Sequence, residues 1–559
     1  MLMDSSASWE FLFVVALLAV IASFPGLWTG RFVTKIESLL ARVAKNRVLA
    51  FCVLFLGAIV IRLSVLPLLE VPIPGIHDEY SYLLMADTFA RGRLTNPTHP
   101  MWRSFETFHV LWHPTYASIY PPAQGFALAI GDWLGLPWIG VLLTAACMGA
   151  VIYWMLCVWM PPHFAFLGGA LVALRLDIAS YWMNSYWGGA VAAIGGALVL
   201  GALPRIFKKG RIRDALLLGL GVAILANSRP YEGLVFCILP AAVFLLWLFG
   251  KRSSSVAKSR RWKAVFLPLA GVLVLMVGFM GYYNWRVTHD PLLFPHTLNW
   301  REYHTAAMFL WQAPKPEKHY DNERFEEYYN DWERDEYHRT LSDAIDVSWT
   351  KTWRLASAFF WWGLILVLPG VLAALRERKT RFLWLTLAAT MLAVYAVTFS
   401  NAHYAAPATC LIFALIVQSV RHVRARRWGR FQWGKALARA AIFLLLVDTG
   451  MHVARRECDQ QDWTCPRDYG RVGIEKRLES LPGKHLVMVR YSGEDGDLSI
   501  HDEWVYNGAD IDSQKVVWAR ELDEEQNKKL FAYFKDHTIW LASSNYDHAS
   551  LVPYTPPEE

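Results

Sequence analysis

Apolar runs of about 20 residues recur along this chain, separated by short polar and often basic segments. A helix of that length crosses a hydrocarbon core of roughly 30 Å and satisfies its own backbone hydrogen bonds in lipid. The pattern therefore predicts a mainly α-helical, polytopic membrane bundle. We expect about twelve spans, at residues 11–28, 48–69, 137–160, 163–181, 188–207, 213–227, 233–250, 264–285, 353–375, 381–399, 403–420 and 436–453.

Two segments between these runs are too long and polar to be simple connectors, and we call them the first long loop (residues 70–136) and the second long loop (287–350). In the first, the spacing predicts a helix over 79–91 with Asp78 at its N-cap. The second is dense in charged and aromatic residues. It is either an amphipathic helix on the membrane surface or a lid over a sugar site, and the sequence leaves both open.

The C-terminal tail, residues 454–559, is polar and predicts a small α/β unit. Alternating or continuous apolar stretches at 485–489, 516–518 and 539–541 indicate strands, and 523–534 has helical spacing. The chain thus divides into an N-terminal span with a basic connector (1–47), a membrane region (48–453) and the tail.

Charge and composition set the class and the orientation. Of the residues, 55% are hydrophobic and only 18% are charged, and the net charge of +7 comes from short Lys/Arg clusters between apolar runs. This is the positive-inside pattern rather than a nucleic-acid signal. Counting the spans puts these clusters on the cytoplasmic side and both long loops and the tail on the other. We expect a bacterial inner-membrane protein with its tail in the periplasm.

The first candidate chemistry is the acidic pair Asp78 and Glu79, which directly follows an apolar run. A carboxylate held against a low-dielectric wall keeps protons more tightly and can act as a general base. The alternative for Asp78 is an N-cap, and the two roles are compatible. The adjacent His77 could bind phosphate or a divalent metal, although one histidine beside two carboxylates is a weak metal pattern.

Further ionisable residues fall near the same end of the spans. Arg175 and Asp177 lie inside an expected span, where they either pair with each other or face a polar cavity. Arg229, with Glu232 close behind it, suits a phosphodiester because a guanidinium binds phosphate oxygens in a bidentate way. The alternative is an arginine that reaches the interface with its charged end.

Two more groups of residues complete the candidates. His403 and Tyr404 could hydrogen-bond a lipid headgroup, or Tyr404 could belong to an interfacial aromatic belt. In the tail, Cys458 and Cys465 form a local disulfide or remain two thiols, and the spacing does not choose between them. Ionisable groups at one depth in the membrane predict a shared site at the outer face.

In order and topology the chain resembles the GT-C superfamily of integral-membrane glycosyltransferases. It is closest in style to protein O-mannosyltransferases and lipid A aminoarabinose transferases. The resemblance covers roughly residues 48–420. Its motifs are Asp78-Glu79, Tyr120-Pro121-Pro122, Arg229-Pro230-Tyr231-Glu232 and His403-Tyr404-Ala405-Ala406-Pro407.

The resemblance implies a polyprenyl-phosphate sugar donor, an extracytoplasmic acceptor and an inverting displacement with Asp78 or Glu79 as base. On this interpretation we expect Arg229 to hold the donor phosphate, with His403 as a second candidate for that role. Where the family often has Lys or Glu before its double proline, this chain has Tyr120, which would also contact substrate. The N-terminal span and the tail are further departures.

Two other classes of protein compete with this interpretation. A transporter or flippase of lipid-linked sugars also has many spans, but its halves often repeat, which these do not, and its sites lie near mid-membrane. A non-catalytic scaffold carrying the tail as a binding module would leave the outer-face charges unexplained.

Overall fold

The computed structural model describes residues 16, 23, 30–250, 261–335, 341–427, 432–456, 470–491, 503–545 and 548–554. Apart from two isolated positions, the expected span at 11–28 lies outside the described residues, as do Cys458 and Cys465.

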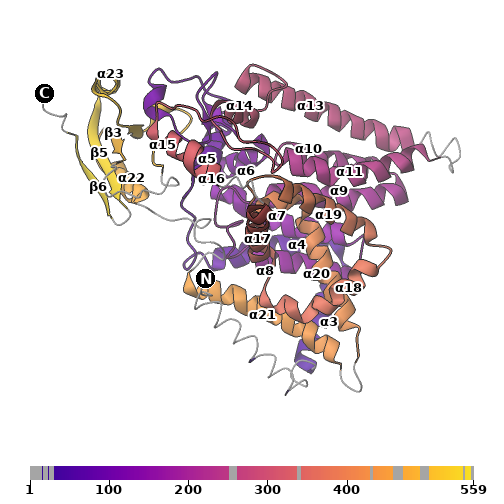
Figure 1. Cartoon of the computed structure of the whole chain (residues 1–559). Coiled ribbons are helices and arrows are strands. Elements are labelled where there is room, and N and C mark those ends of the chain that lie inside the picture. Colours follow the sequence, from indigo (N-terminus) through magenta and orange to yellow (C-terminus); the bar gives the residue numbers. More distant parts are fainter. Residues whose placement is uncertain are drawn as a thin grey trace.

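The described chain is mainly helical, and its long helices are gathered in one body (Figure 1). Seven helices are long and apolar enough to cross a membrane, or eight if one bent pair is a single span. Twelve spans are therefore not confirmed. The helices that correspond to expected spans are α4 (Arg47–Ser64), α7 (Trp138–Leu156), α8 (Pro162–Leu176), α9 (Ala190–Lys209), α10 (Ile212–Ala226), α11 (Pro230–Phe249), α13 (Leu267–Thr288), α19 (Arg381–Ala396), α20 (Thr409–Arg424) and α21 (Trp433–Arg455).

The span expected at 353–375 does not form one straight helix. There α17 (Leu341–Phe359) is followed by the segment Trp362–Arg376, which includes α18 (Leu368–Arg376), and the two are bent by 93°. Trp361 is extended at the break, and its indole nitrogen donates to the Ala441 carbonyl of α21 at 2.8 Å. This contact with α21 fixes the turn in the chain, and composition alone does not reveal it.

Residues 31–45, expected only as a basic connector, form helix α3 (Arg31–Lys45). Its Glu37 accepts hydrogen bonds from Arg424 and Arg439, the shortest to each being 2.7 Å. Burial alone would raise the pKa of Glu37, but the two arginines hold the pKa at about 2. The helix is thus tied to α20 and α21 by ion pairs.

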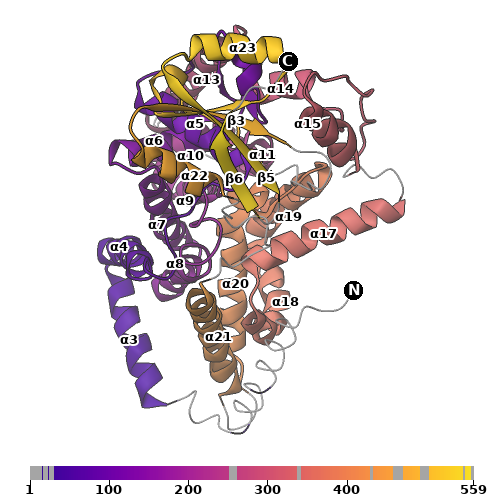
Figure 2. The same ribbon diagram turned by 90° about the vertical axis from the view of Figure 1, so that its left-hand side faces the viewer.

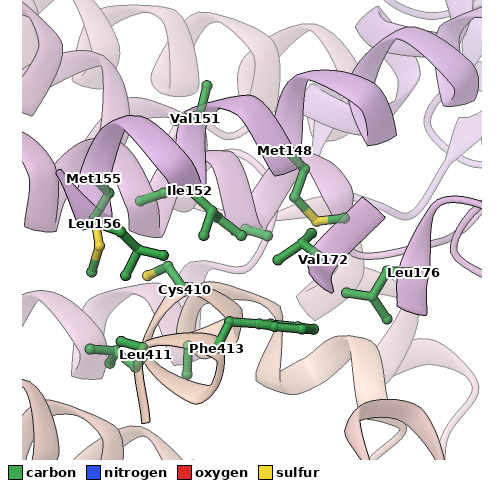
Figure 3. Packing of buried hydrophobic residues seen from close by; sticks show 14 of the residues in the cluster. Met148, Val151, Ile152, Met155, Leu156, Val172, Leu176, Cys410, Leu411 and Phe413 are labelled. Carbon is green, nitrogen blue, oxygen red and sulfur yellow. The ribbon is translucent and has the colours of Figure 1, made fainter. Parts of the chain in front are cut away.

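The membrane core forms where α7, α8, α9 and α20 meet. Figure 3 shows Met148, Met155 and Val172 of α7 and α8 facing Phe413 of α20. Glycines allow the closest approaches: a Cβ at Gly196 of α9 would lie 2.0 Å from the Pro407 carbonyl oxygen. The packing therefore fixes the turn at 402–408 against α9.

The first long loop is folded rather than open. It holds α5 (His77–Ala90), α6 (Pro122–Trp133) and a two-stranded hairpin of β1 (Val110–Leu111) and β2 (Ala117–Ser118). The helix expected at 79–91 is present, but its N-cap is Ile76, and Asp78 lies inside the first turn. The N-cap interpretation of Asp78 is therefore wrong, and its carboxylate is left for other contacts.

The second long loop holds several short helices in place of one surface helix: α14 (Pro295–Glu302), α15 (Glu323–Glu326), a π-helical turn (Glu327–Trp332) and α16 (Glu333–Asp335). Phe325 and Tyr329 are fully buried and pack with Phe108 of the first long loop. The two long loops thus fold on each other.

The tail is the small α/β unit that the sequence predicts. It contains α22 (Arg471–Ser480), β3 (Lys484–Arg490), β4 (Val516–Arg520), α23 (Glu524–Tyr533), β5 (His537–Asn545) and β6 (His548–Pro553). The strand order is β4-β3-β5-β6, with β3 parallel to both neighbours and β6 antiparallel to β5.

The tail sheet lies beside α5, at the end of the molecule far from α3 (Figure 2). One apolar core contains residues of both parts, including Leu84 and Phe105 of the first long loop and Leu486 and Met488 of β3. The backbone nitrogen of Ala509 also donates to Asp87 at 2.7 Å. The tail therefore packs directly on the first long loop.

Candidate functional site

The first turn of α5 presents Asp78 to two side chains of the same loop. The Tyr120 hydroxyl donates a hydrogen bond to Asp78 Oδ1 and also lies 3.2 Å from His109 Nδ1. That nitrogen is 3.8 Å from Asp78 Oδ2. His109 has a left-handed backbone (φ 57°), a conformation uncommon outside glycine that often marks functional sites. Asp78, His109 and Tyr120 thus form one polar cluster.

Glu79, the second member of the acidic pair, has a different environment. It is 2% exposed, and its carboxylate accepts the backbone N–H groups of Gly75 at 2.8 Å and Tyr186 at 2.9 Å. Burial raises the pKa of Glu79 to about 7. The Asp78 side chain, by contrast, is 23% exposed. Of the two carboxylates, only Asp78 can meet a substrate in this arrangement.

A cavity of about 280 Å³ lies beside this cluster, with Tyr120 in its wall. Arg229, Glu232 and Tyr404, all expected at the outer ends of spans, line the same cavity. Most of the remaining wall is apolar, with Pro121, Pro122, Met280, Tyr283, Phe294 and Phe309 among its members. The cavity therefore combines a polar end with walls suited to a hydrocarbon chain.

Three helices begin at this cavity, and each has a proline in its first turn: Pro122 in α6, Pro230 in α11 and Pro295 in α14. Proline suits this position because the first helical N–H groups have no partner within the helix. A helix N-terminus carries partial positive charge and attracts anions. Three such ends favour a negatively charged group in the cavity.

Arg229 provides a full positive charge at the same place. Its guanidinium lies 4.3 Å from the centre of the Tyr404 ring, and it forms no ion pair within the described part of the chain. His296 also lines the cavity, and burial, followed by the nearby charges of His304 and Arg229, lowers its pKa to about 4. At neutral pH the fixed cation of this wall is therefore Arg229.

His77, Asp78 and His109 could hold a divalent cation, since one ligand atom from each lies within 4.8 Å of the others. Two imidazoles and a carboxylate suit Zn²⁺ or a similar ion. The Tyr120 hydroxyl, however, already contacts both Asp78 and His109. His77 itself is buried, with its ring 4.9 Å from that of Phe108.

Other expected site residues do not reach this cavity. Arg175 and Asp177 do not pair with each other: Arg175 binds Asp448 of α21 at 3.1 Å, and the Asp177 carboxylate is buried with no hydrogen-bond partner among the described residues. His403 is buried, and its Nδ1 lies 3.0 Å from the Tyr181 hydroxyl. Arg175 is thus engaged by an ion pair with a residue distant in sequence, and His403 is engaged by its contact with Tyr181.

Sequence reasoning missed His109, Tyr82 and His296. Tyr82 follows Asp78 by one helical turn, and its ring stacks on that of Tyr120 at 4.5 Å, so helical spacing could have revealed it. His109 lies in the turn before β1 and His296 in the first turn of α14, and neither belongs to a recognisable motif. Their positions become visible only in three dimensions.

No protein-family model matches the sequence, and no curated protein does. Among solved structures, the fold is similar to an oligosaccharyltransferase of Archaeoglobus fulgidus tethered to an acceptor peptide with an NVT sequon (TM-score 0.44, 12% identity, 78% of this chain covered). This chain spans only 62% of that protein's length.

It is also similar to ArnT of Cupriavidus metallidurans. The apo state gives a TM-score of 0.47 and 13% identity, and the form bound to undecaprenyl phosphate gives 0.48 and 11%. Both comparisons cover 88% of this chain and 92% of ArnT. At these identities the likeness concerns the fold alone.

Proposed function

We propose that this protein is a membrane glycosyltransferase that moves a sugar from a polyprenyl-phosphate donor to an acceptor outside the cytoplasm. One observation carries the proposal: Tyr120 binds Asp78 with its hydroxyl and lines the cavity that Arg229 also lines. This contact supports the proposal, because a carboxylate that could accept a proton would lie beside a cavity whose arginine could hold a phosphate.

The donor would lie with its phosphate at the three helix N-termini and Arg229, and with its prenyl chain along the apolar wall. Part of that wall, Met280 and Tyr283, belongs to α13. The candidate span that contains α13 is the least buried of the seven, at 11%. A lipid chain could therefore pass from the membrane into the cavity beside this helix.

The transfer would proceed in a single displacement. The oxygen or nitrogen of the acceptor attacks the anomeric carbon of the donor sugar. Asp78 accepts the proton that this acceptor atom loses. The bond from that carbon to the phosphate oxygen breaks as the new bond forms, so the anomeric configuration inverts. The leaving polyprenyl phosphate gains negative charge, which Arg229 and the helix ends stabilise.

The remaining candidate residues divide by position. Glu232 and Tyr404 line the cavity and would contact donor, whereas Glu79 would hold the turn at 75–79 against Tyr186.

We place the catalytic region at 48–453 and the tail at 454–559. Both loops would face the periplasm of a bacterial inner membrane, in line with the basic clusters between the spans.

The test is turnover of a radiolabelled polyprenyl-phosphate sugar by the purified full chain in lipid nanodiscs. Release of labelled sugar to water gives a readout even before the acceptor is known. We expect Asp78→Asn to reduce turnover by about a hundredfold or more, since general bases contribute roughly 10²–10⁴. Glu79→Gln is the matched neighbour and should turn over donor if it folds.

Two results would contradict the proposal. Full turnover in Asp78→Asn would remove the proposed base. Passage of the labelled lipid across the bilayer without any cleavage of the sugar–phosphate bond would point to a flippase instead.

A further inference from the structure

A second, larger cavity of about 1050 Å³ lies where the tail meets the two long loops. It shares no lining residue with the cavity that contains Arg229. The first long loop contributes residues such as Trp102, the second contributes Tyr303 and several residues of 319–327, and the tail contributes Arg490, Tyr491 and several residues of 520–526. Segments far apart in sequence therefore build a single polar cleft.

We propose that this cleft binds a neutral saccharide chain, which is the acceptor of the transfer reaction. The inference rests on the proposed function and adds the chemical class of the acceptor to it.

The walls of the cleft are held by buried contacts. Arg520 pairs with Glu503 at 2.6 Å, and both side chains are buried. Tyr491 is held between two arginines, with Arg520 4.9 Å and Arg324 5.2 Å from the centre of its ring. Such fixed side chains lose little freedom when a ligand binds, which favours affinity.

The charges of the cleft largely neutralise one another. Its lining contains four arginines and six acidic residues. Arg490 donates to Glu521 at 2.7 Å, and Arg324 pairs with Glu327 at 3.1 Å. The acidic residues thus outnumber the arginines, which disfavours a phosphate or another anion and leaves an uncharged ligand compatible with the cleft.

The side-chain chemistry suits a polyhydroxylated ligand. Sugar hydroxyls both donate and accept hydrogen bonds, as the carboxylates, guanidinium groups and amides of the lining require. Aromatic residues such as Trp102 and Tyr320 can cover the apolar face of a sugar ring.

A peptide fits the cleft less well. Leu522 is the only aliphatic side chain in its lining, so it offers little to apolar peptide side chains. The edge strand β4 is buried along its whole length, and Arg520 donates to the Glu106 carbonyl of the first long loop at 3.3 Å. The edge is thus covered and cannot add a peptide strand.

Two buried aromatic side chains separate the cleft from the turn that carries the proposed base. Phe325 lines it and lies 4.8 Å, between ring centres, from Phe108. Phe108 in turn lies 4.9 Å from His77, the residue before Asp78. One end of a saccharide in the cleft would therefore lie two aromatic side chains away from the Asp78 turn.

The test measures binding of short, neutral, linear oligosaccharides of glucose, mannose, galactose and arabinose to the full chain in nanodiscs, without donor, by saturation-transfer NMR and calorimetry. We expect at least one series to bind. Trp102→Ala and Asp321→Asn should weaken that binding at least tenfold. Asp321 is 83% exposed, so its variant should fold normally. Tyr533→Ala, on the same tail but outside the cleft, should bind as wild type does.

Three results would overturn the inference: no binding by any saccharide, equal loss in Tyr533→Ala, or binding of a Ser/Thr-rich peptide that saccharides do not displace. Donor turnover in the same preparations reports on the proposed function separately. Failure of saccharide binding with Asp78-dependent turnover intact would reject only the acceptor class, whereas saccharide binding without any turnover would reject the proposed reaction.

Discussion

Tyr120 donates its hydroxyl hydrogen bond to Asp78 from the wall of the cavity that Arg229 also lines. The bond joins the residue before the double proline to the first turn of α5, 42 positions earlier. It orients the carboxylate while leaving part of it open. Substitutions at and around this hydrogen bond should therefore have measurable effects.

Tyr120→Phe should lower turnover while leaving the fold intact. The Phe ring can keep the stacking on Tyr82, so the variant removes only the hydroxyl. A hydrogen bond to a charged group contributes about 1.5–3 kcal/mol, so kcat should fall roughly ten- to a hundredfold. Tyr533→Phe is the matched control, because its hydroxyl donates to Asp512 on the surface at 3.1 Å. Unchanged kcat in Tyr120→Phe would remove Tyr120 from the mechanism.

Arg229→Gln should weaken binding of undecaprenyl phosphate by about ten- to a hundredfold, because a charge-assisted contact to phosphate is lost. The measurement is titration of the lipid phosphate into protein in nanodiscs. Arg286→Gln, at an exposed position of α13, serves as the control. Equal affinity in wild type and Arg229→Gln would place the phosphate elsewhere.

Glu79 should make stability depend on pH. Its folded pKa of about 7 exceeds the unfolded value of 4.5, so the folded state holds the proton more tightly. Its contribution is complete below pH 4.5 and is lost as pH rises to 7, an effect on the order of 3 kcal/mol. The melting temperature of wild type should therefore fall between pH 5 and 8 more than that of Glu79→Gln. Parallel profiles would contradict this assignment.

Chelation should leave turnover unchanged. The Tyr120 hydroxyl already contacts Asp78 and His109, two of the three residues that would hold a cation. The assay compares turnover before and after treatment with EDTA, with Mn²⁺ and Zn²⁺ added back. If chelation abolished activity and an added metal restored it, Asp78 would be a metal ligand instead of a general base.

Gly196→Ala should destabilise the membrane core. The new methyl group would lie 2.0 Å from the Pro407 carbonyl oxygen, so α9 must move away from the turn that carries Tyr404. Overpacking of this kind costs about 1–3 kcal/mol. A lower melting temperature with weaker donor binding is expected. Gly271→Ala is the control, since its added methyl group meets no atom within 4 Å.

The sequence predicted the elements whose signal is local. Apolar length placed α7, α9 and α13 close to their observed bounds, and β-branched runs placed β3 and β4 in the tail. The bend at Trp361 could not be predicted from the sequence, because its cause, the contact with Ala441 of α21, lies 80 residues away.

The candidate site, like the fold, could be predicted only where its residues belong to local sequence patterns. Asp78, Arg229 and Tyr404 were expected near one depth in the membrane; Arg229 and Tyr404 line one cavity, and Asp78 is joined to its wall through Tyr120. The partner of Arg175 was not predictable, since Asp448 is 273 positions away, and His109 follows no motif. Residues whose role depends on contacts with distant parts of the chain can be identified only from the three-dimensional structure.

The shared core of first long loop and tail has a consequence for biosynthesis. The ribosome releases Leu84 and Phe105 long before it reaches Leu486 and Met488, which complete the same core. During that interval an apolar surface of the nascent loop stays uncovered, and such surfaces aggregate readily. Newly made chains should thus depend on a chaperone at the translocon exit, and truncation of the final strands should trigger degradation of the whole protein.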